Sequence, residues 1–419
     1  MHVFILTSVY PSQYAPKGTT PVVHYFAKEW VLAGHKVHVF HTVSTFPKAY
    51  YFLAKPFKRF MDTRLGFVVP TQMPKEYNET KDGVEVSHVL LKKAKPHGRF
   101  AKKQIQRVLG IVASYIEKEG VPDCFVGHWD NPQLELLHAL KEKYHRRTCL
   151  VYHVNNFSQL SKIYGDETET LVSDIDLVGF RNITAQTDYE KYFKKPSQSF
   201  IAASGVSRPF IEAGMGFRKE IGKIEKFIYV GTLIRRKYPA VVIEALHQSY
   251  QQEPFEITYI GEGNEKKQIQ QRFDELGCKG ELVFTGRIAR EEVIQYLKKS
   301  DVFVMISKDE VFGLVYLEAM ALGCITIASR HEGIDGIIED GVNGFLCEAG
   351  NSDELASIVS RIRRMNRNIP LILISFVFML LTGETPYGNP VSIARGNKAF
   401  IKHIIYSGKP QSRSGKQNL

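Results

Sequence analysis

Residues 307–329 read SKDEVFGLVYLEAMALGCITIAS, and this stretch decides how the chain is expected to fold. A polar loop leads at Gly313 into a short apolar segment that stops at Gly323. Apolar residues between two glycines predict a helix over 313–322. The β-branched run CITIAS that follows predicts a buried strand. Loop, helix and strand in this order indicate one unit of a parallel α/β sheet.

The same alternation extends through the second half of the chain. We expect strands at KFIYVG, EITYIG, ELVFTG, DVFVMIS and CITIAS, with helices near 239–250, 264–276, 290–299 and 313–322. Three of these strands end in glycine, at Gly231, Gly261 and Gly286. Glycine there lets a ligand approach the backbone closely, at the sheet edge where α/β proteins bind ligands. The alternative is that these glycines only make tight turns.

The first half shows a similar but weaker alternation of strands and helices. The length of 419 residues favours two domains. Strands are expected at 2–6, 36–43, 124–128 and 149–154, and helices at 22–34 and 132–144. The segment 197–226 is rich in glycine and is therefore expected to connect the two domains. We expect a first domain over 1–200, a linker over 201–225 and a second domain over 226–364.

Composition narrows the class of protein. A hydrophobic content of 44% with 24% charged residues is typical of soluble globular proteins. The five cysteines are scattered and form no C-x-x-C pair, so they indicate neither a disulfide framework nor a zinc site. The opening MHVFILTSVYP lacks the basic segment of a signal peptide, and a cytoplasmic location is therefore expected.

Residues 365–419 differ from the rest of the chain. From residue 361 onward there are ten Lys and Arg against one acid, which accounts for +9 of the net charge of +11. Global basicity is therefore no argument for nucleic-acid binding. The apolar run 369–382 is short for a membrane span. A frameshift or fused sequence is the favoured explanation, and a membrane-contacting extension is the alternative; the end is expected to be partly disordered.

Two acids flank the start of the predicted helix. A helix N-terminus suits phosphate, because its free N–H groups and its dipole attract negative charge. Glu318 lies about 7.5 Å along the axis, where a carboxylate can accept hydrogen bonds from a ribose diol. Glu310 precedes the helix and would face a sugar at the other end of a diphosphate. The alternatives are a solvated loop acid at Glu310 and, at Glu318, an exposed position beside a buried stripe of Leu314, Leu317 and Ala321.

The motif EVFGLVYLEAMA, residues 310–321, resembles the signature of retaining glycosyltransferases of the GT-B fold, family four (group 1). Two glutamates with seven residues between them, with Phe-Gly after the first and Glu-Ala-Met-Ala at the second, carry the resemblance. HEGIDGIIEDGVNGFL, residues 331–346, resembles the family's glycine-rich continuation. The resemblance extends from residue 1 to about 362. It implies an α/β protein of GT-B architecture, with two Rossmann-like parallel-sheet domains facing each other across a cleft.

The resemblance also implies an activity, which is retaining transfer of a hexosyl group from a nucleotide-sugar. UDP is the expected nucleotide. Glu310, Lys237 and His153 are the implied catalytic residues, with Lys237 from FIYVGTLIRRKYP on the phosphate and His153 from VYHVNNF facing the sugar. Thr232 stands where many members have arginine, and Arg236 is a candidate to supply that charge. His128 is a second candidate histidine.

The remaining donor-binding positions come from shorter matches. Gly18 lies in a loop that resembles the one over the donor phosphates, and Gly261 and Gly263 lie in a nucleotide-pocket loop. Arg287 and Ile288 resemble the stretch near the base. At the predicted helix start, the implied phosphate-binding residues are Phe312, Gly313 and Leu314, and Glu318 is implied to bind the ribose.

No metal and no cofactor beyond the nucleotide-sugar substrate are implied. The acidic D-x-D pair, Asp174 and Asp176, falls in SDIDLV, where we expect a helix and see no further ligands. The implied acceptor is a glycan or a polyprenyl-diphosphate-linked sugar in the synthesis of cell-surface polysaccharide or lipopolysaccharide. Nucleic acid is not an expected partner.

Two basic segments suggest a membrane partner. Residues 91–107 hold seven Lys and Arg and no acid, and residues 46–61 mix aromatic residues with four cations. Such surfaces suit an anionic membrane, which would place the enzyme on the inner face of the plasma membrane. The alternative is a solvated basic face.

Two other functions remain open. A nucleotide-sugar epimerase can share the GT-B architecture, although it should lack the paired glutamates. A donor-binding but catalytically impaired homologue is the second alternative, because Thr232 and the unusual tail depart from the family pattern.

Overall fold

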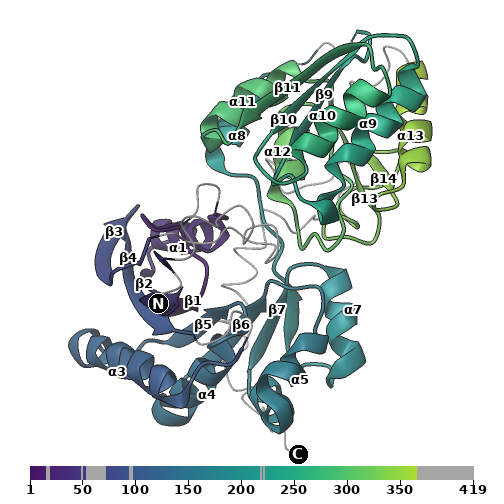
Figure 1. Ribbon diagram of the computed structural model, residues 1–419. Coiled ribbons are helices and arrows are strands. Elements are labelled where there is room, and N and C mark those ends of the chain that lie inside the picture. The colour runs from purple at the N-terminus through teal and green to yellow at the C-terminus, as the bar shows by residue number, and fades with distance from the viewer. Residues whose placement is uncertain are drawn as a thin grey trace, which may run out of the picture.

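The computed structural model describes residues 1–15, 19–48, 51–52, 72–93, 98–217, 219 and 222–365. These residues form two α/β bodies, each built around one sheet (Figure 1). Gly18, most of the basic segment 46–61 and the tail from residue 366 lie outside the described residues. The expectations for the tail and for Gly18 therefore stay predictions.

The first sheet has eight strands in the order β3-β4-β2-β1-β5-β6-β7-β8. Only the β3–β4 pair is antiparallel, and all other neighbours are parallel. The strands are β1 (His2–Thr7), β2 (Lys36–Thr45), β3 (Tyr77–Lys81), β4 (Val84–Lys92), β5 (Cys124–His128), β6 (Arg147–Tyr152), β7 (Leu177–Phe180) and β8 (Ser199–Ile201). Parallel neighbours require crossover connections, and the helices of this domain provide them.

The side chains of alternate residues in these strands point to opposite faces of the sheet. In β1, Phe4 and Leu6 join the core on one face, while Val3 and Ile5 join the core on the other. The first face packs against most helices of the domain, and the second packs against α1 (Figure 1). The helices are α1 (Val22–Leu32), α3 (Lys102–Glu119), α4 (Gln133–Tyr144), α5 (Ser158–Tyr164), α6 (Thr168–Ser173) and α7 (Ile183–Tyr192).

The second sheet has six parallel strands in the order β11-β10-β9-β12-β13-β14. Counted from β9, this is the order 3-2-1-4-5-6 of a Rossmann sheet. The strands are β9 (Lys226–Val230), β10 (Phe255–Ile260), β11 (Gly280–Gly286), β12 (Val302–Val304), β13 (Ile325–Ser329) and β14 (Phe345–Cys347). The strand order reverses between β9 and β12, so the crevice expected to bind ligands lies beyond the carboxyl ends of these two strands.

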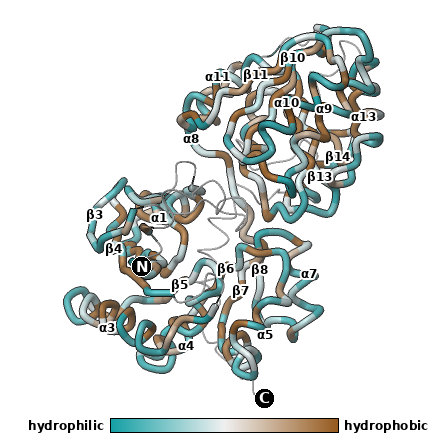
Figure 2. Tube along the Cα trace, in the orientation of Figure 1, coloured by the Kyte–Doolittle hydropathy of each residue, from teal (hydrophilic) through white to brown (hydrophobic). Residues whose placement is uncertain are grey.

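Helices cover both faces of the second sheet and share its single hydrophobic core. They are α8 (Arg208–Gly214), α9 (Pro239–Tyr250), α10 (Lys266–Glu275), α11 (Arg290–Lys299), α12 (Leu314–Ala321) and α13 (Ser352–Arg364). Figure 2 shows the apolar residues gathered along the inner strands of both domains. α8 belongs to the segment expected to link the domains, and it packs against α11 and α12.

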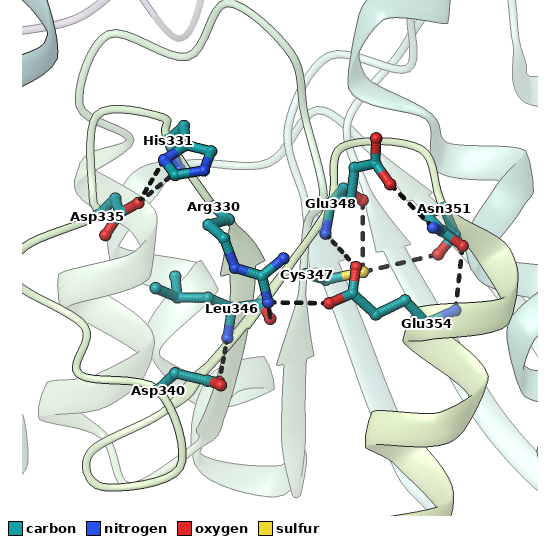
Figure 3. Close-up of polar contacts among 9 residues, drawn as sticks. All are labelled: Arg330, His331, Asp335, Asp340, Leu346, Cys347, Glu348, Asn351 and Glu354. Carbon is teal, nitrogen blue, oxygen red and sulfur yellow. Dashed lines mark hydrogen bonds and ion pairs between the residues drawn. The ribbon is translucent and has the colours of Figure 1, made fainter.

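A network of hydrogen bonds and ion pairs holds the segments that join β13, β14 and α13 (Figure 3). The Arg330 guanidinium donates to the Leu346 carbonyl at 3.0 Å and pairs with Glu354 at 2.9 Å. The Asn351 side chain caps α13 by accepting from the Glu354 N–H at 3.0 Å. These contacts hold the glycine-rich stretch 331–346 against the end of the sheet.

One sequence expectation about structure was wrong. SDIDLV was expected in a helix, but α6 ends at Ser173, and Asp174 and Asp176 lie in the turn before β7. Asp174 accepts from the His138 ring at 2.8 Å, and Lys141 pairs with Asp176 at 2.8 Å. The two acids therefore join helix α4 to the turn, which the spacing of apolar residues alone could not show.

Within the described part of the chain, none of the helices combines the length and the apolar character needed to span a bilayer.

Candidate active site

Lys237 and Glu310 meet where the strand order of the second sheet reverses. Lys237 ends the 3₁₀ turn Arg235–Lys237 that follows β9, and Glu310 lies in the loop that follows β12. The Lys237 ammonium lies 2.8 Å from the Glu310 carboxylate, and the two side chains are 13% and 15% exposed. The sequence placed these residues 73 positions apart, and the fold brings them into one ion pair at the edge where ligands are expected.

The loop that carries Glu310 is held by its neighbours. The Glu332 carboxylate accepts from the backbone N–H groups of Asp309 at 3.0 Å and Glu310 at 2.7 Å. Arg236 donates to the carbonyls of Lys308 and Asp309 at 3.0 and 3.2 Å. Arg236 was expected to bind donor phosphate, and in this structure its guanidinium fixes the Glu310 loop.

Helix α12 starts directly after this loop. Its N-cap residue, Gly313, has φ of +67°, a conformation that favours glycine. A Cβ at this position would also come within 2.3 Å of the Tyr316 ring. Gly313 has no side chain to cap the first turn, and among the described residues no other side chain accepts from the N–H groups at the start of α12. Phe312, just before it, is buried, and Leu314 is half-buried. The helix start can therefore accept an anion.

Glu318 is buried on α12 at 3% exposure, so the alternative of an exposed helix position is wrong. The Arg290 guanidinium, from the start of α11, forms an ion pair and hydrogen bond with its carboxylate. Burial raises the pKa of Glu318, and the charge of Arg290 opposes that rise. Arg290 was not among the residues expected at the site.

The glycines after β10 serve close backbone packing. A Cβ on Gly261 would lie 1.9 Å from the Gly231 carbonyl oxygen, and one on Gly263 would lie 2.0 Å from that of Leu233. The Leu233 N–H donates to the Glu262 carbonyl at 3.0 Å. The loops after β9 and β10 are thus joined beside Lys237. Further along, Arg287 is exposed and Ile288 is half-buried against the core.

Two asparagines of the first domain reach the Glu310 loop. Asn155 donates to the Glu310 carbonyl at 3.1 Å, and Asn182 donates to the Val311 carbonyl at 2.5 Å. Asn182 also donates to the side-chain oxygen of Asn155 at 3.0 Å. Both residues follow strands of the first sheet, β6 and β7. The two domains therefore meet at the loop that carries Glu310.

His153 lies two residues before Asn155 and is half-buried. Its Nε2 shares a hydrogen bond with His128 Nδ1 at 2.9 Å, and its ring stacks on Trp129 with centroids 4.0 Å apart. Burial, followed by the nearby Arg181 guanidinium, lowers the pKa of His153 well below its ordinary value. The pKa of His128 falls to about 3 for the same reasons. Both histidines are therefore neutral near pH 7.

Arg181 is a buried cation at the junction where the two domains meet, and it was not predicted from the sequence. Its guanidinium donates to the Ala202 carbonyl at 2.5 Å and to the Ser204 hydroxyl, and it lies 4.9 Å from the Phe312 ring centroid. Burial lowers its pKa to about 9.

Several residues of the junction were not predicted, although their sequence positions offered a signal. Polar residues directly after buried strands lie at the carboxyl edge of a parallel sheet. Asn155 follows VYHV and the pair Arg181–Asn182 follows LVGF, so both satisfy this rule. Arg290 and Glu332 gave no such signal, because their partners are distant in the sequence.

Residues 217–368 match the family described as "Glycosyl transferases group 1". This match assigns the second domain of the chain to the group 1 glycosyltransferases. N-acetyl-alpha-D-glucosaminyl L-malate synthase of Bacillus anthracis is 28% identical over 35% of this chain and 41% of its own length. The amylovoran biosynthesis glycosyltransferase AmsK of Erwinia amylovora is 30% identical over 35% of this chain and 38% of its own. The matched part of the chain spans about two fifths of these relatives.

A solved structure shares the fold over nearly the whole chain. Anabaena HepE, solved in complex with UDP and glucose, superposes with a TM-score of 0.62 at 18% identity, over 96% of this chain and 99% of HepE. The architecture is GT-B, with two parallel-sheet α/β domains, as the sequence predicted.

Proposed function

We propose that the protein transfers a hexosyl group from a nucleotide-sugar, with retention of anomeric configuration and without a metal ion. The expected donor is UDP-linked, because HepE is described with UDP and glucose bound. The expected acceptor is a glycan or a polyprenyl-diphosphate-linked sugar in the synthesis of cell-surface polysaccharide or lipopolysaccharide. AmsK, named for amylovoran biosynthesis, supports this context.

The ion pair between Lys237 and Glu310 at the start of α12 is the observation that carries the proposal. A donor lying across this helix would place its diphosphate at the free N–H groups after Gly313 and beside the Lys237 ammonium. Glu310 would accept hydrogen bonds from the sugar. Glu318 would accept from the ribose hydroxyls, and the charge of Arg290 would favour the ionised form of its buried carboxylate.

The reaction follows from this placement. The bond between the anomeric carbon and the β-phosphate oxygen breaks, and the acceptor hydroxyl bonds to the same face of that carbon. The acceptor proton passes to the departing phosphate oxygen. Lys237 and the helix start stabilise the negative charge that develops on the leaving diphosphate, while Glu310 stabilises positive charge on the sugar. His153 is neutral and would orient the sugar by hydrogen bonding.

We include an anionic membrane surface among the proposed partners, but ion pairs within the protein already occupy some of the cations that would contact it. Arg107 binds Glu76 at 2.6 Å, and Arg99 binds Glu135 and Glu167. Of the cations of this segment that the structure describes, the exposed lysines Lys92, Lys102 and Lys103 remain, and Lys95 lies outside the described residues. Lys102 and Lys103 begin α3, where a helix dipole disfavours positive charge, so helix stability does not explain them.

This part of the proposal places the protein on the inner face of the plasma membrane. Flotation with liposomes of anionic or zwitterionic lipid tests it. The protein is expected to float only with anionic lipid and to release as salt rises. Equal behaviour with both lipids would remove the membrane from the proposal.

Acceptor-dependent release of nucleoside diphosphate tests the proposed activity. Purified protein would be given UDP-glucose, UDP-N-acetylglucosamine or GDP-mannose, with and without a polyprenyl-diphosphate-linked monosaccharide. The proposal predicts UDP release that needs the acceptor, and a product whose NMR spectrum shows the donor's anomeric configuration. Glu310→Gln is expected to reduce the rate by about 10²- to 10³-fold. Glu339→Gln, in the nearby exposed loop, is the matched control.

The same assay separates the two alternatives. Conversion of the nucleotide-sugar into an epimer without transfer would identify an epimerase. Donor binding without turnover on any of these acceptors would favour a catalytically impaired homologue. A product of inverted configuration would contradict the proposed mechanism while leaving transferase activity in place.

A further inference from the structure

Four side chains of the first domain converge at the sheet edge opposite the candidate active site. They come from the start of β1 (His2), the third residue of β2 (His38), β4 (Glu85) and the last residue of α3 (Glu119). We propose that His38, Glu85 and Glu119, with a fourth position left to water, form a binding site for Zn²⁺ or a similar divalent transition metal. The site does not depend on the proposed transferase activity.

The spacing of the ligand atoms fits such an ion. His38 Nδ1 lies 3.4 Å from Glu85 Oε2 and 3.5 Å from Glu119 Oε1. His2 Nε2 lies 3.6 Å from Glu119 Oε2. A tetrahedral zinc ion with bonds of about 2.0–2.2 Å places neighbouring ligand atoms about 3.4 Å apart. The atoms of His38, Glu85 and Glu119 all lie within 4.8 Å of one another.

The backbone fixes two of these ligands side by side. His38 and Glu85 are direct partners in the parallel register of β2 and β4. Glu119 approaches from α3, whose residues pack on the same face of the sheet as Phe4 and Phe40. The His38 ring stacks on Phe40, with centroids 4.5 Å apart. Its position is therefore set by packing rather than by a flexible surface loop.

His38 presents a free lone pair to the cluster. Its side chain is 3% exposed, its Nε2 lies 2.9 Å from the Ser87 hydroxyl, and Ser87 donates its own hydrogen to Tyr115 at 3.0 Å. Nε2 must then be the protonated nitrogen that donates to Ser87. Nδ1 has no hydrogen-bond partner among the described residues. A second-shell bond of this kind orients metal-binding histidines.

The cluster needs a positive charge. With the proton on Nε2, Nδ1 of His38 and the two carboxylate oxygens are all acceptors, and they face one another at 3.4 and 3.5 Å. Glu119 also ends α3, where the helix dipole disfavours a negative charge. Lys36 supplies part of the charge, because its ammonium lies 2.9 Å from Glu119 Oε2, but its side chain is 50% exposed and reaches only that oxygen. A metal ion at the centre would satisfy all three acceptors.

The ligand types select the class of metal. One imidazole with two carboxylates favours Zn²⁺ and its transition-metal neighbours over Mg²⁺ and Ca²⁺, which prefer oxygen alone. A bound ion would join β2 and β4 to the end of α3. Its role would be structural, since the strands' other ends face the candidate active site.

Metal titration tests the site without any sugar substrate. Full-length protein would be treated with chelator, desalted and titrated with Zn²⁺ by calorimetry and with Co²⁺ by visible absorption. We expect one saturable site per chain and Co²⁺ bands of tetrahedral intensity. His38→Gln and Glu85→Gln should each weaken binding at least tenfold. His331→Gln, which removes an exposed histidine paired with Asp335, is the matched control and should bind normally.

Glu85 is 51% exposed, so Glu85→Gln is expected to fold even if His38→Gln does not. Absence of a saturable site, or equal affinity in Glu85→Gln and the natural protein, would overturn the proposal. Transferase activity measured separately on the same samples would keep this result distinct from the proposed function.

Discussion

The Lys237–Glu310 ion pair brings together the cation proposed to bind the donor's diphosphate and the carboxylate proposed to bind its sugar. Both side chains are largely enclosed, so their attraction is less screened by solvent than that of a surface pair. Truncating either partner leaves the other charged and without its counter-ion. The effects of the two substitutions on activity should therefore not be additive.

Lys237→Gln is expected to lower the transfer rate by about 10²- to 10³-fold, because the leaving diphosphate loses its fixed cation. Steady-state rates with UDP-glucose would measure the loss. Lys226→Gln, at the exposed start of the same strand β9, is the control and should keep normal activity. A Lys237→Gln enzyme with more than a tenth of the natural rate would contradict the role given to Lys237.

The Arg290–Glu318 pair predicts a pH-dependent loss of stability. In Arg290→Gln, the buried Glu318 carboxylate has no counter-charge, so its folded-state pKa rises further above the unfolded value. Stability is then present at low pH and is lost as pH rises through the folded pKa. Removing one partner of a buried pair costs roughly 3–5 kcal/mol, and we expect about 2–3 because Arg290 is 33% exposed.

Urea unfolding at pH 5 and pH 8 would measure this loss. The deficit of Arg290→Gln should be larger at pH 8, and Arg290→Gln combined with Glu318→Gln should recover part of it. If Arg290→Gln lost the same amount of stability at both pH values, ionisation of Glu318 would not be the cause of the loss.

At the scale of elements, the start of α12 depends on one glycine. Gly313→Ala should destabilise the protein by about 1–2 kcal/mol, because φ of +67° is costly for alanine, and should weaken UDP binding. Gly110→Ala is the matched control. Gly110 lies inside α3 with nothing within 4 Å of an added Cβ, so alanine there should stabilise by about 0.5–1 kcal/mol.

Thermal melts with and without UDP would measure both effects. A Gly313→Ala protein with normal stability and an unchanged UDP-induced shift would show that the conformation of Gly313 is unimportant.

Elements of the second sheet could be predicted from the sequence, because each strand is an apolar run ended by glycine or a polar loop. β12 is the partial exception. A strand was expected over 301–307, but ladder pairing covers only Val302–Val304, and Met305 to Ser307 are buried at its end. The burial of Glu318 could not be predicted, since its partner Arg290 lies 28 residues earlier in the sequence. Pairings at such separation follow from the fold and leave no local pattern.

At the scale of the whole molecule, the domains meet through polar contacts of the Glu310 loop. Asn155 and Asn182 bind its carbonyls, and Arg181 lies against Phe312. A relative movement of the domains would therefore move the backbone that carries Glu310. The sequence predicted the two bodies but not this junction, because its contacts join residues more than a hundred positions apart.

Buried neutral histidines predict a loss of global stability in mild acid. His41, which faces His88, and His128, which faces Arg181, have folded-state pKa values of about 3 against 6.5 unfolded. Between these values only the unfolded chain takes up the proton, so stability falls as pH drops below 6.5. Each histidine contributes about 1.4 kcal/mol per pH unit.

Urea unfolding between pH 7.5 and 5.0 would give the slope. Buried carboxylates with raised pKa values, such as Glu318, have the opposite pH dependence, so the comparison with a histidine variant is needed to isolate the histidine contribution. His128→Gln should flatten the pH dependence. An identical slope in His128→Gln and the natural protein would remove His128 from the explanation.

We propose that an activated sugar lies across the start of α12, with Lys237 and Glu310 at one end and Glu318 at the other. A crystal structure with bound UDP-glucose is the sharpest test of this placement. The diphosphate is expected within about 3 Å of the Lys237 ammonium and of the backbone N–H groups after Gly313. The ribose hydroxyls are expected to donate to the Glu318 carboxylate. A nucleotide bound outside the crevice between β9 and β12, or one that leaves the Glu318 carboxylate untouched, would contradict it.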